Sequence, residues 1–398
     1  MKRIVVVGGG FAGMWGALAA ARKTDLSGVS ANNVEISLIN RDGFHCIRPR
    51  LYENDLTEAR IPLASVLEPA GVKLIEGHVQ AIRPGNKTIS VGNGNGDQQI
   101  AYDRLVYAAG SILSMPDIPG GAAHSFNIDN FGEAERLNAH LKSLPEFDDT
   151  EGRLTVAVVG AGFTGLELAC ELPARLSALA SAAQPRVILV DQAPVLGATL
   201  GDNPRQEIER VVNSLGIETR LGVQVSRIDA DGLTLDDGST IPAKTVVWTS
   251  GNLGSPVGQN LEVPLDELGR VPVDGQLRVK GLPQVFAAGD AAQVPVDDTH
   301  IAVMSCQHAM PQGRYAGHNA AADLLGEPLL DYRQPTYVTC LGLGPKDAIY
   351  TEGWERTVRN TDAYQLKRDI LTQWIYPPSS GDRAEILAAA EPVTVDYY

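Results

Sequence analysis

Apolar runs along the chain end repeatedly in turns made of glycine and other small residues. Residues 4–7 are β-forming and lead directly into a Gly-x-Gly-x-x-Gly turn at 8–13, and a helical pattern of small residues follows. Residues 155–159 lead in the same way into a second copy of the turn at 160–165. A strand, turn and helix of this kind present backbone N–H groups at a helix N-terminus, where a pyrophosphate can bind. Two copies predict two dinucleotide-binding units.

The stretches that follow each turn are also duplicated. Each unit has a second strand, a hairpin pattern, and a strand that ends in small residues at 105–111 or 245–251. This repetition indicates an internal duplication. A further apolar run at 284–292 ends in Gly-Asp and would return the chain to the first unit. Helices are expected at 131–144, 163–183, 203–215, 305–325 and 364–376. Pro173 would disturb the second of these, and Pro311 would lie in the first turn of the fourth. Residues 219–235 alternate like antiparallel strands, and further strands are expected at 336–341, 348–354 and 355–359.

The pattern predicts an α/β fold with two Rossmann-like dinucleotide-binding domains and a C-terminal α+β region. The first domain is interrupted by the second. The expected boundaries are 1–116 and 269–330 for the two parts of the first domain, 117–268 for the second domain, and 331–398 for the C-terminal region.

Composition narrows the functional classes. The net charge of −15 argues against a nucleic-acid partner, which requires clustered Lys and Arg, and disfavours an anionic membrane surface. The four cysteines form no C-x-x-C pair, the seven histidines show no metal spacing, and no metal is expected. Free thiols suit a reducing compartment, so a cytoplasmic location is expected, although a distant Cys306–Cys340 pair stays open.

Several residues are candidates for cofactor contacts. In the first turn these are Gly8, Gly10, Phe11, Ala12 and Gly13, and in the second they are Gly160, Gly162 and Gly165. Further candidates at strand ends and loops are Asn40, Arg41, Arg48, Ala109, Gly110, Asp191, Gly251, Gly289 and Asp290.

The ends of the second strands distinguish the two units. Asp191 stands where a carboxylate contacts the adenosine ribose, and it favours NADH because it would repel the 2′-phosphate of NADPH. Asn40 occupies the corresponding place in the first unit, with an acceptor oxygen but no charge. Arg48 and Arg50, in the loop after Asn40, could face a phosphate or a flavin edge, or be solvated surface charges. Asp290 could bind a sugar or ribityl hydroxyl.

The ordered blocks resemble the two-dinucleotide-fold flavoproteins of the pyridine nucleotide-disulfide oxidoreductase superfamily over residues 1–325. Two stretches make the chain most similar to the type II NADH dehydrogenases. These are Gly-Ala-Gly-Phe-Thr-Gly-Leu-Glu at 160–167 and Ser-Cys-Gln-His-Ala-Met-Pro-Gln-Gly-Arg-Tyr at 305–315.

The resemblance implies FAD in the first unit and NADH in the second. It places Glu167 near the nicotinamide, aims the N-terminus of the helix near 305 at the flavin pyrimidine ring, and matches Gln307 to the first glutamine of a quinone-proximal motif. Two departures stand in that motif: Cys306 replaces an alanine, and Pro311 replaces a second glutamine. His308 is a further candidate because it falls in the same stretch.

The leading hypothesis is therefore an FAD-dependent oxidoreductase that takes hydride from NADH and passes electrons to a quinone-like acceptor. A soluble reductase of a small electron-transfer protein or metabolite, and a flavin-bound signalling protein, are the alternatives. Cys46 beside a flavin could cycle through sulfenic acid or be an idle thiol. Residues 364–376 could contact a membrane surface or pack on the protein's own acceptor side, and a homodimer is a further expectation.

Overall fold

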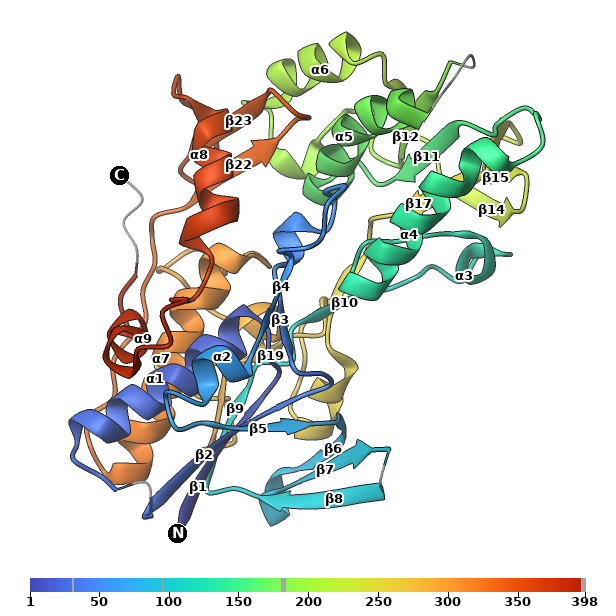
Figure 1. The fold of residues 1–398 in the computed structure, drawn as a ribbon. Helices are drawn as coiled ribbons and strands as arrows, with labels where there is room; N and C mark the ends of the chain where they lie inside the picture. Colours follow the sequence, from blue (N-terminus) through green and yellow to red (C-terminus); the bar gives the residue numbers. More distant parts are fainter. Residues whose placement is uncertain (31, 95, 180–183, 395–398) are drawn as a thin grey trace.

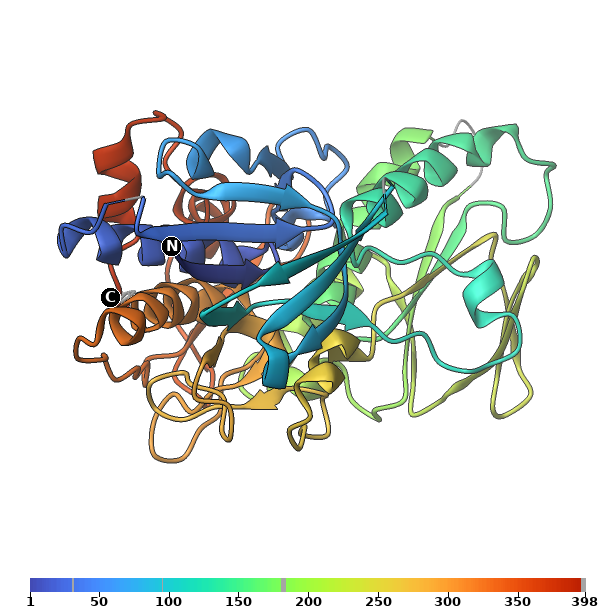
Figure 2. The same cartoon turned by 90° about the horizontal axis from the view of Figure 1, so that it is seen from below.

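The computed structural model describes residues 1–30, 32–94, 96–179 and 184–394. It has two lobes, each built on a parallel sheet (Figure 1). The view from below separates the lobe that holds the chain's N-terminus from the lobe formed by the middle of the chain (Figure 2). The arrangement confirms the predicted fold class.

The first sheet contains the N-terminal strand at its centre. Apolar β-formers fill β1 (Lys2–Val7), which is buried on both faces as expected for a central parallel strand. Strand β20 (Val285–Ala287) pairs with β9 (Arg104–Tyr107), so a segment near residue 285 completes a sheet begun at residue 2. The strand order is β20-β9-β1-β2-β5, with β2 at Val34–Asn40 and β5 at Lys73–Glu76. The predicted hairpin is a three-stranded antiparallel sheet of β6 (His78–Arg83), β7 (Thr88–Asn93) and β8 (Gly96–Ala101).

The second sheet repeats this plan with the order β13-β12-β11-β17. Its strands are β13 (Glu218–Leu221), β12 (Arg186–Asp191), β11 (Thr155–Val159) and β17 (Thr245–Trp248). The expectation that 219–235 is antiparallel throughout is wrong for its first part, because β13 extends the parallel sheet beside β12. The remainder is an antiparallel meander, as expected, of β14 (Val225–Asp229), β15 (Gly232–Leu235) and β16 (Thr240–Pro242).

Short antiparallel pairs connect the two units. Strand β10 (Ser111–Leu113) pairs with β18 (Asn252–Gly254), so the chain leaves and re-enters the first unit along one ribbon. The Tyr107 hydroxyl reinforces this crossing by donating to the Ser255 carbonyl at 3.1 Å. The other short elements are β3 (Phe44–Cys46), β4 (Arg60–Pro62), α2 (Ala64–Leu67), α3 (Gly121–His124), β19 (Val271–Pro272) and β21 (Ala292–Gln293).

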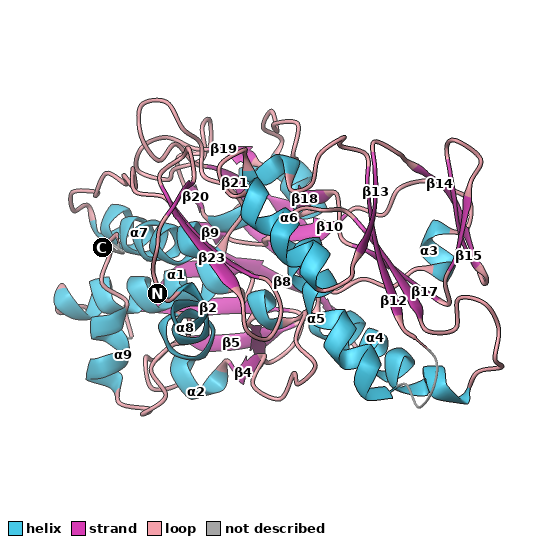
Figure 3. Cartoon of the chain, turned by 90° about the horizontal axis from the view of Figure 1, so that it is seen from above, coloured by secondary structure: helices cyan, strands magenta, loops and turns pink. Residues whose placement is uncertain are grey.

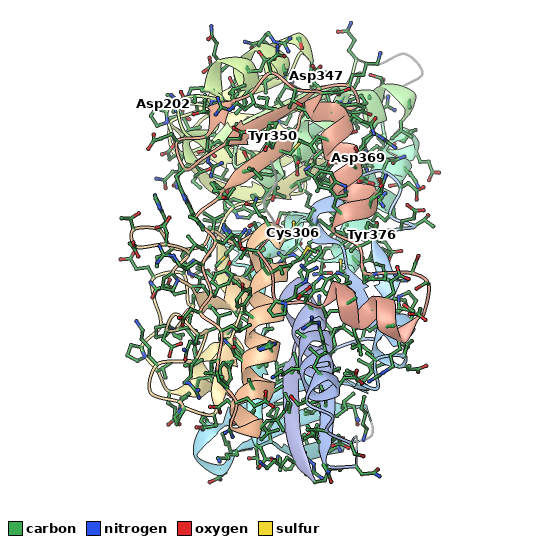
Figure 4. All side chains as sticks on the ribbon, turned by 90° about the vertical axis from the view of Figure 1, so that its left-hand side faces the viewer. Asp202, Cys306, Asp347, Tyr350, Asp369 and Tyr376 are labelled. Carbon is green, nitrogen blue, oxygen red and sulfur yellow. The ribbon has the colours of Figure 1, made fainter. Side chains whose placement is uncertain are left out.

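Two helices pack side by side against one face of the first sheet. They are α1 (Phe11–Leu26) and α7 (Cys306–Leu325), and both views from the side show them in contact (Figures 1 and 4). The contact is so close that a Cβ on Gly313 would lie 2.2 Å from the Ala12 carbonyl oxygen. A larger residue at this position would force the helices apart. The helices of the second lobe are α4 (Phe131–Ser143), α5 (Phe163–Leu179) and α6 (Arg205–Ser214).

Proline lies inside two helices without ending them. Pro173 is within α5, and the part of the predicted helix at 180–183 lies outside the described residues. Pro311 is in the second turn of α7 and not, as expected, in the first, because the helix begins at Cys306 after the Ser305 cap. The missing proline N–H leaves the Gln307 carbonyl without its helical partner. The Gln334 side chain donates to that carbonyl at 3.4 Å instead.

The C-terminal region bridges the lobes. Its sheet of β22 (Val338–Gly342), β23 (Ala348–Glu352) and β24 (Thr357–Val358) packs beside the second lobe. The chain then descends toward α1 and α7, as the positions of Tyr350 and Tyr376 show (Figure 4). The predicted helix at 364–376 is α8 (Ala363–Asp369) continued by a π-helix at Ile370–Trp374, and α9 (Arg383–Ala389) lies against α1 (Figure 3).

Candidate functional site

A cavity of about 1240 Å³ lies where the two lobes and the C-terminal region meet. Its walls come from the carboxyl ends of the parallel strands, which is where open α/β sheets bind ligands. Predicted site residues that line it are Gly8, Gly10, Phe11, Ala12, Asn40, Arg41, Arg48, Ala109, Gly110, Glu167, Gly289, Asp290 and Gln307. The structure thus brings the first turn together with the start of α5 and the start of α7.

Other predicted residues do not line this cavity. Gly13 lies under the first turn, and Gly160, Gly162, Gly165, Asp191 and Gly251 belong to the second turn and its surroundings. His308 is 1% exposed and is not among the residues that line the cavity. Its Nδ1 contacts Ser305 Oγ and the Val303 carbonyl oxygen at 3.2 Å, so its side chain is tied to the loop before α7.

The first turn is shaped for an anion at its open side. A Cβ on Gly13 would lie 1.8 Å from the Gly8 carbonyl oxygen, so only glycine allows α1 to start this close to β1. The Asn40 side chain accepts the Gly9 N–H at 2.9 Å. Gly10 faces the cavity with open space in front of it. The donors at the start of α1 fit a dinucleotide pyrophosphate.

The Asp191 side chain holds the second glycine turn, at residues 160–165. The Asp191 carboxylate accepts the N–H of Ala161 at 2.5 Å and that of Ala193 at 2.7 Å. Both bonds fix Asp191 at the end of β12, beside the backbone N–H groups that start α5. The arrangement suits a ribose-facing carboxylate.

Arg48 takes part in a polar network across the cavity wall. Its guanidinium pairs with Asp129, which precedes α4, and donates to Ser111 Oγ at 3.0 Å. The Ser111 hydroxyl donates in turn to Asp290 Oδ2 at 2.7 Å. Arg48 therefore joins the loop after β3 to the second lobe and to Asp290. Arg41 is exposed at the cavity wall, and its Nε lies 4.0 Å from Asp42 Oδ2.

The loop's other arginine serves a different purpose. Arg50 donates through Nε and Nη2 to the Glu53 carboxylate at 2.8–3.0 Å, and its Nη1 donates to the Tyr376 hydroxyl at 2.6 Å. These contacts anchor the C-terminal segment to the first lobe. Arg50 is therefore not available as a phosphate ligand.

A buried ion pair lies where the C-terminal region meets the cavity. Lys367, from α8, donates to Glu167 Oε1 at 2.6 Å and to the Cys340 carbonyl at 3.0 Å. The Gly342 N–H donates to the same Glu167 oxygen at 3.0 Å. Burial raises the pKa of Glu167, and the Lys367 ammonium opposes that shift. Tyr52 lies beside this pair, with Lys367 Nζ 5.9 Å from the centre of its ring.

Sequence reasoning identified Glu167 but missed Lys367 and Tyr52. A lysine inside the apolar pattern of 366–375 was the available signal, since a charged residue there must pair when buried. Gln307, in contrast, is used structurally. Its amide oxygen accepts the Val338 N–H at 3.2 Å and its amide nitrogen donates to the Val338 carbonyl at 2.6 Å, which joins α7 to β22.

All four cysteines are free thiols. Burial raises the pKa of Cys46 and Cys306 to about 11, and that of Cys170 and Cys340 to about 12. A reactive cysteine requires a lowered pKa so that its thiolate forms near neutral pH. The raised pKa values therefore favour the role of packed thiols for these four side chains. Within the described ranges, no cluster of three or more His, Cys, Asp or Glu side chains could hold a metal ion. No helix in the described part of the chain is long and apolar enough to cross a membrane.

The paired βαβ units, the glycine turns and the junctional cavity define a two-dinucleotide-domain oxidoreductase. Residues 2–313 match the pyridine nucleotide-disulphide oxidoreductase family, and the chain belongs to that family. This confirms the resemblance drawn from the motifs.

Individual relatives refine the placement. The chain is 46% identical over 397 residues to the NADH dehydrogenase-like protein Rv1812c of Mycobacterium tuberculosis, with 98% of each chain covered. It is 25% identical over 396 residues to a type II NADH:quinone oxidoreductase of Staphylococcus epidermidis, covering 94% of this chain and 95% of that one. The sulfide:quinone oxidoreductase of Aquifex aeolicus has the same fold, with a TM-score of 0.78 at 18% identity over 96% of this chain and 93% of that one.

Proposed function

We propose that this protein is an NADH:quinone oxidoreductase that holds FAD in its first unit and NADH in its second. The observation that carries the proposal is the single cavity in which the first turn, Glu167 with Lys367, and the start of α7 meet. The named relatives include NADH dehydrogenase-like and NADH:quinone oxidoreductases, which supports the same reading.

The first unit offers the groups that FAD requires. Backbone N–H groups at the start of α1 would hold the pyrophosphate, and Asp290 would accept a ribityl hydroxyl. The N-terminus of α7 carries partial positive charge and would favour negative charge on the pyrimidine side of the ring. When bound, FAD supplies the redox chemistry, since its ring takes two electrons as hydride from NADH and passes them on. Ala109 and Gly110 let the ligand approach the end of β9.

The second unit would bind NADH in preference to NADPH. Asp191 keeps its carboxylate at the ribose end of the turn, where it would accept a hydroxyl and repel a phosphate. Gly160, Gly162 and Gly165 would approach the pyrophosphate as their counterparts do in the first unit. Gly251 would serve the nicotinamide side at the end of β17.

The ion pair would supply the proton that quinone reduction needs. Hydride carries two electrons and one proton, so a quinone that becomes a quinol takes one further proton from solvent. Lys367 lines the cavity, and its ammonium would donate a hydrogen bond to an acceptor oxygen and then the proton, which solvent would replace. Glu167 would hold the ammonium in place, and Tyr52 would offer a second donor.

Peripheral attachment to a membrane, a cytoplasmic location and a homodimer stay predictions. The exposed Trp374, at the end of the π-helix, is the apolar side chain most suited to a membrane contact beside the cavity. Its ring is 48% exposed.

An anaerobic titration tests the proposal. The purified protein is expected to carry the absorbance of oxidised flavin, to bleach on addition of NADH, and to regain colour with a soluble quinone. NADPH is expected to bleach it far more slowly at equal concentration. A protein that binds no FAD, or a reduced form that no quinone reoxidises, contradicts the proposal.

A further inference from the structure

We propose that His45 is a positioning residue that makes the first turn the tighter of the two dinucleotide sites. The inference rests on the proposed function, because it concerns how FAD is retained while NADH exchanges. The His45 ring is fully buried on β3, and its Nδ1 lies 3.0 Å from the Gly9 carbonyl oxygen. It also meets the Phe11 ring edge to face at 4.7 Å.

The hydrogen bond identifies the tautomer of His45. Burial lowers the pKa of His45 to about 4, so the ring is neutral at pH 7 and carries one proton. Nδ1 faces a carbonyl oxygen, which only accepts, so the proton is on Nδ1. Nε2 is buried and has no partner among the residues that the structure describes. The ring's one donor is therefore directed to Gly9.

This bond sets the direction of the next N–H group. In a trans peptide the carbonyl and the following N–H point in opposite directions. His45 holds the Gly9 carbonyl on the buried side, so the Gly10 N–H points to the cavity that Gly10 lines. Asn40 fixes the preceding peptide by accepting the Gly9 N–H. The two peptides on either side of Gly9 are thus held in place before any phosphate binds.

The two copies of the turn differ in their glycine content and in the residue that corresponds to His45. The first has three consecutive glycines at 8–10, which are the most costly to order, whereas the second has Ala161 in the middle. Five residues after the end of β2 stands His45, and five residues after the end of β12 stands Leu196, which cannot donate. In the second copy the Thr249 hydroxyl donates to the Gly160 carbonyl at 3.2 Å, whereas in the first copy His45 faces the carbonyl one residue further on, that of Gly9.

Preorganisation lowers the ordering cost of binding and so slows dissociation. A turn held by His45 and Asn40 suits a cofactor that stays bound through many turnovers. In the second turn, Asp191 and Thr249 both hold the same peptide, between Gly160 and Ala161, which suits a dinucleotide that leaves after each turnover. His45 thereby distinguishes the first site by holding a second peptide of its turn.

The test compares FAD release with NADH binding in four variants. His45→Leu transplants the residue of the second copy, His45→Phe keeps an aromatic ring without the donor, and His45→Asn keeps a donor near Nδ1. His318→Leu is the matched control, because burial also lowers the pKa of His318 to about 4 but its side chain is on α7, away from both turns. FAD release is followed by the rise in flavin fluorescence after dilution, and NADH affinity by anaerobic titration.

His45→Leu and His45→Phe are expected to release FAD about tenfold faster, the effect of losing one hydrogen bond, with the NADH Kd unchanged within about twofold. His45→Asn is expected to stay within about threefold of the native rate, and His318→Leu to match it. Equal release from the Leu, Phe and Asn variants, or no acceleration in Leu and Phe, overturns the inference. Those outcomes leave the proposed function intact. Native protein that holds no FAD would overturn both the proposed function and this inference, so the two failures can be told apart.

Discussion

The pair of Lys367 and Glu167 is expected to contribute both to stability and to the proposed acceptor reduction. Replacing Lys367 with Met leaves the Glu167 carboxylate buried without its cation, and breaking such a pair costs about 3–5 kcal/mol. We expect a lower melting temperature and acceptor reduction slowed at least about tenfold, with flavin reduction by NADH affected less. Stopped-flow measurement of the two half-reactions separates these effects.

A double variant distinguishes electrostatics from packing. Lys367→Met with Glu167→Gln removes both charges, so it is expected to recover part of the lost stability but not the rate of acceptor reduction. Lys142→Met, at an exposed position on α4, is the control and should change neither. A double variant no more stable than Lys367→Met would contradict the ion-pair account.

Asp191 gives a second prediction at a single residue. Asp191→Asn removes the charge that would repel a 2′-phosphate and weakens the contacts to Ala161 and Ala193. We expect kcat/KM for NADH to fall about tenfold and the preference for NADH over NADPH to narrow, an effect of about 1.4 kcal/mol. Asp237→Asn, in the exposed turn after β15, is the control. An unchanged NADH-to-NADPH ratio would contradict the role given to Asp191.

At the scale of elements, the contact between α1 and α7 carries the most specific prediction. Gly313→Ala places a Cβ 2.2 Å from the Ala12 carbonyl oxygen, which neither backbone can avoid without moving. We expect this variant to be destabilised by about 1–3 kcal/mol, measured by urea unfolding. Gly132→Ala, in α4 with its nearest neighbour at 3.6 Å, is the control and should be neutral or slightly stabilising.

Local pattern predicted most elements but not how they pair. The strands of both sheets follow from apolar runs, and the glycine turns follow from spacing. Strand β13 was misassigned because a strand's own sequence does not say whether its neighbour is parallel. Pro311 was misplaced because the Ser305 cap fixes where α7 begins, and the Gln334 contact that tolerates a proline there comes from a distant segment.

At the scale of the whole molecule, the cavity could be predicted only in part. The turns and Asp290 were identifiable because each belongs to a motif with a local physical reason, whereas Glu167 was implied by the resemblance to the type II NADH dehydrogenases. Lys367 was not, because its pairing with Glu167 depends on the C-terminal segment folding back across both lobes. Arg48 was recognised as a candidate, but its attachment to Asp129 and Ser111 arises only when the lobes are assembled.

Buried neutral histidines make the whole fold sensitive to acid. Burial lowers the pKa of His45 and His308 from 6.5 to about 4, so below pH 6.5 the unfolded chain binds protons that the folded chain does not. Each histidine therefore contributes stability that is fully present above pH 6.5 and is lost as the pH falls toward 4, about 3 kcal/mol in total for each. The raised pKa of Glu167 acts in the opposite direction.

We expect the melting temperature to fall steeply between pH 6.5 and 4.5, measured at constant ionic strength with FAD in excess. Burial also lowers the pKa of His318 to about 4, so His308→Gln removes one of three such groups without touching the first turn and should make the decline about a third less steep. Since Gln cannot be protonated in this range, the remaining slope reports His45 and His318. A melting temperature that is flat over this range, or equally steep in His308→Gln, would contradict the assignment of the acid sensitivity to these rings.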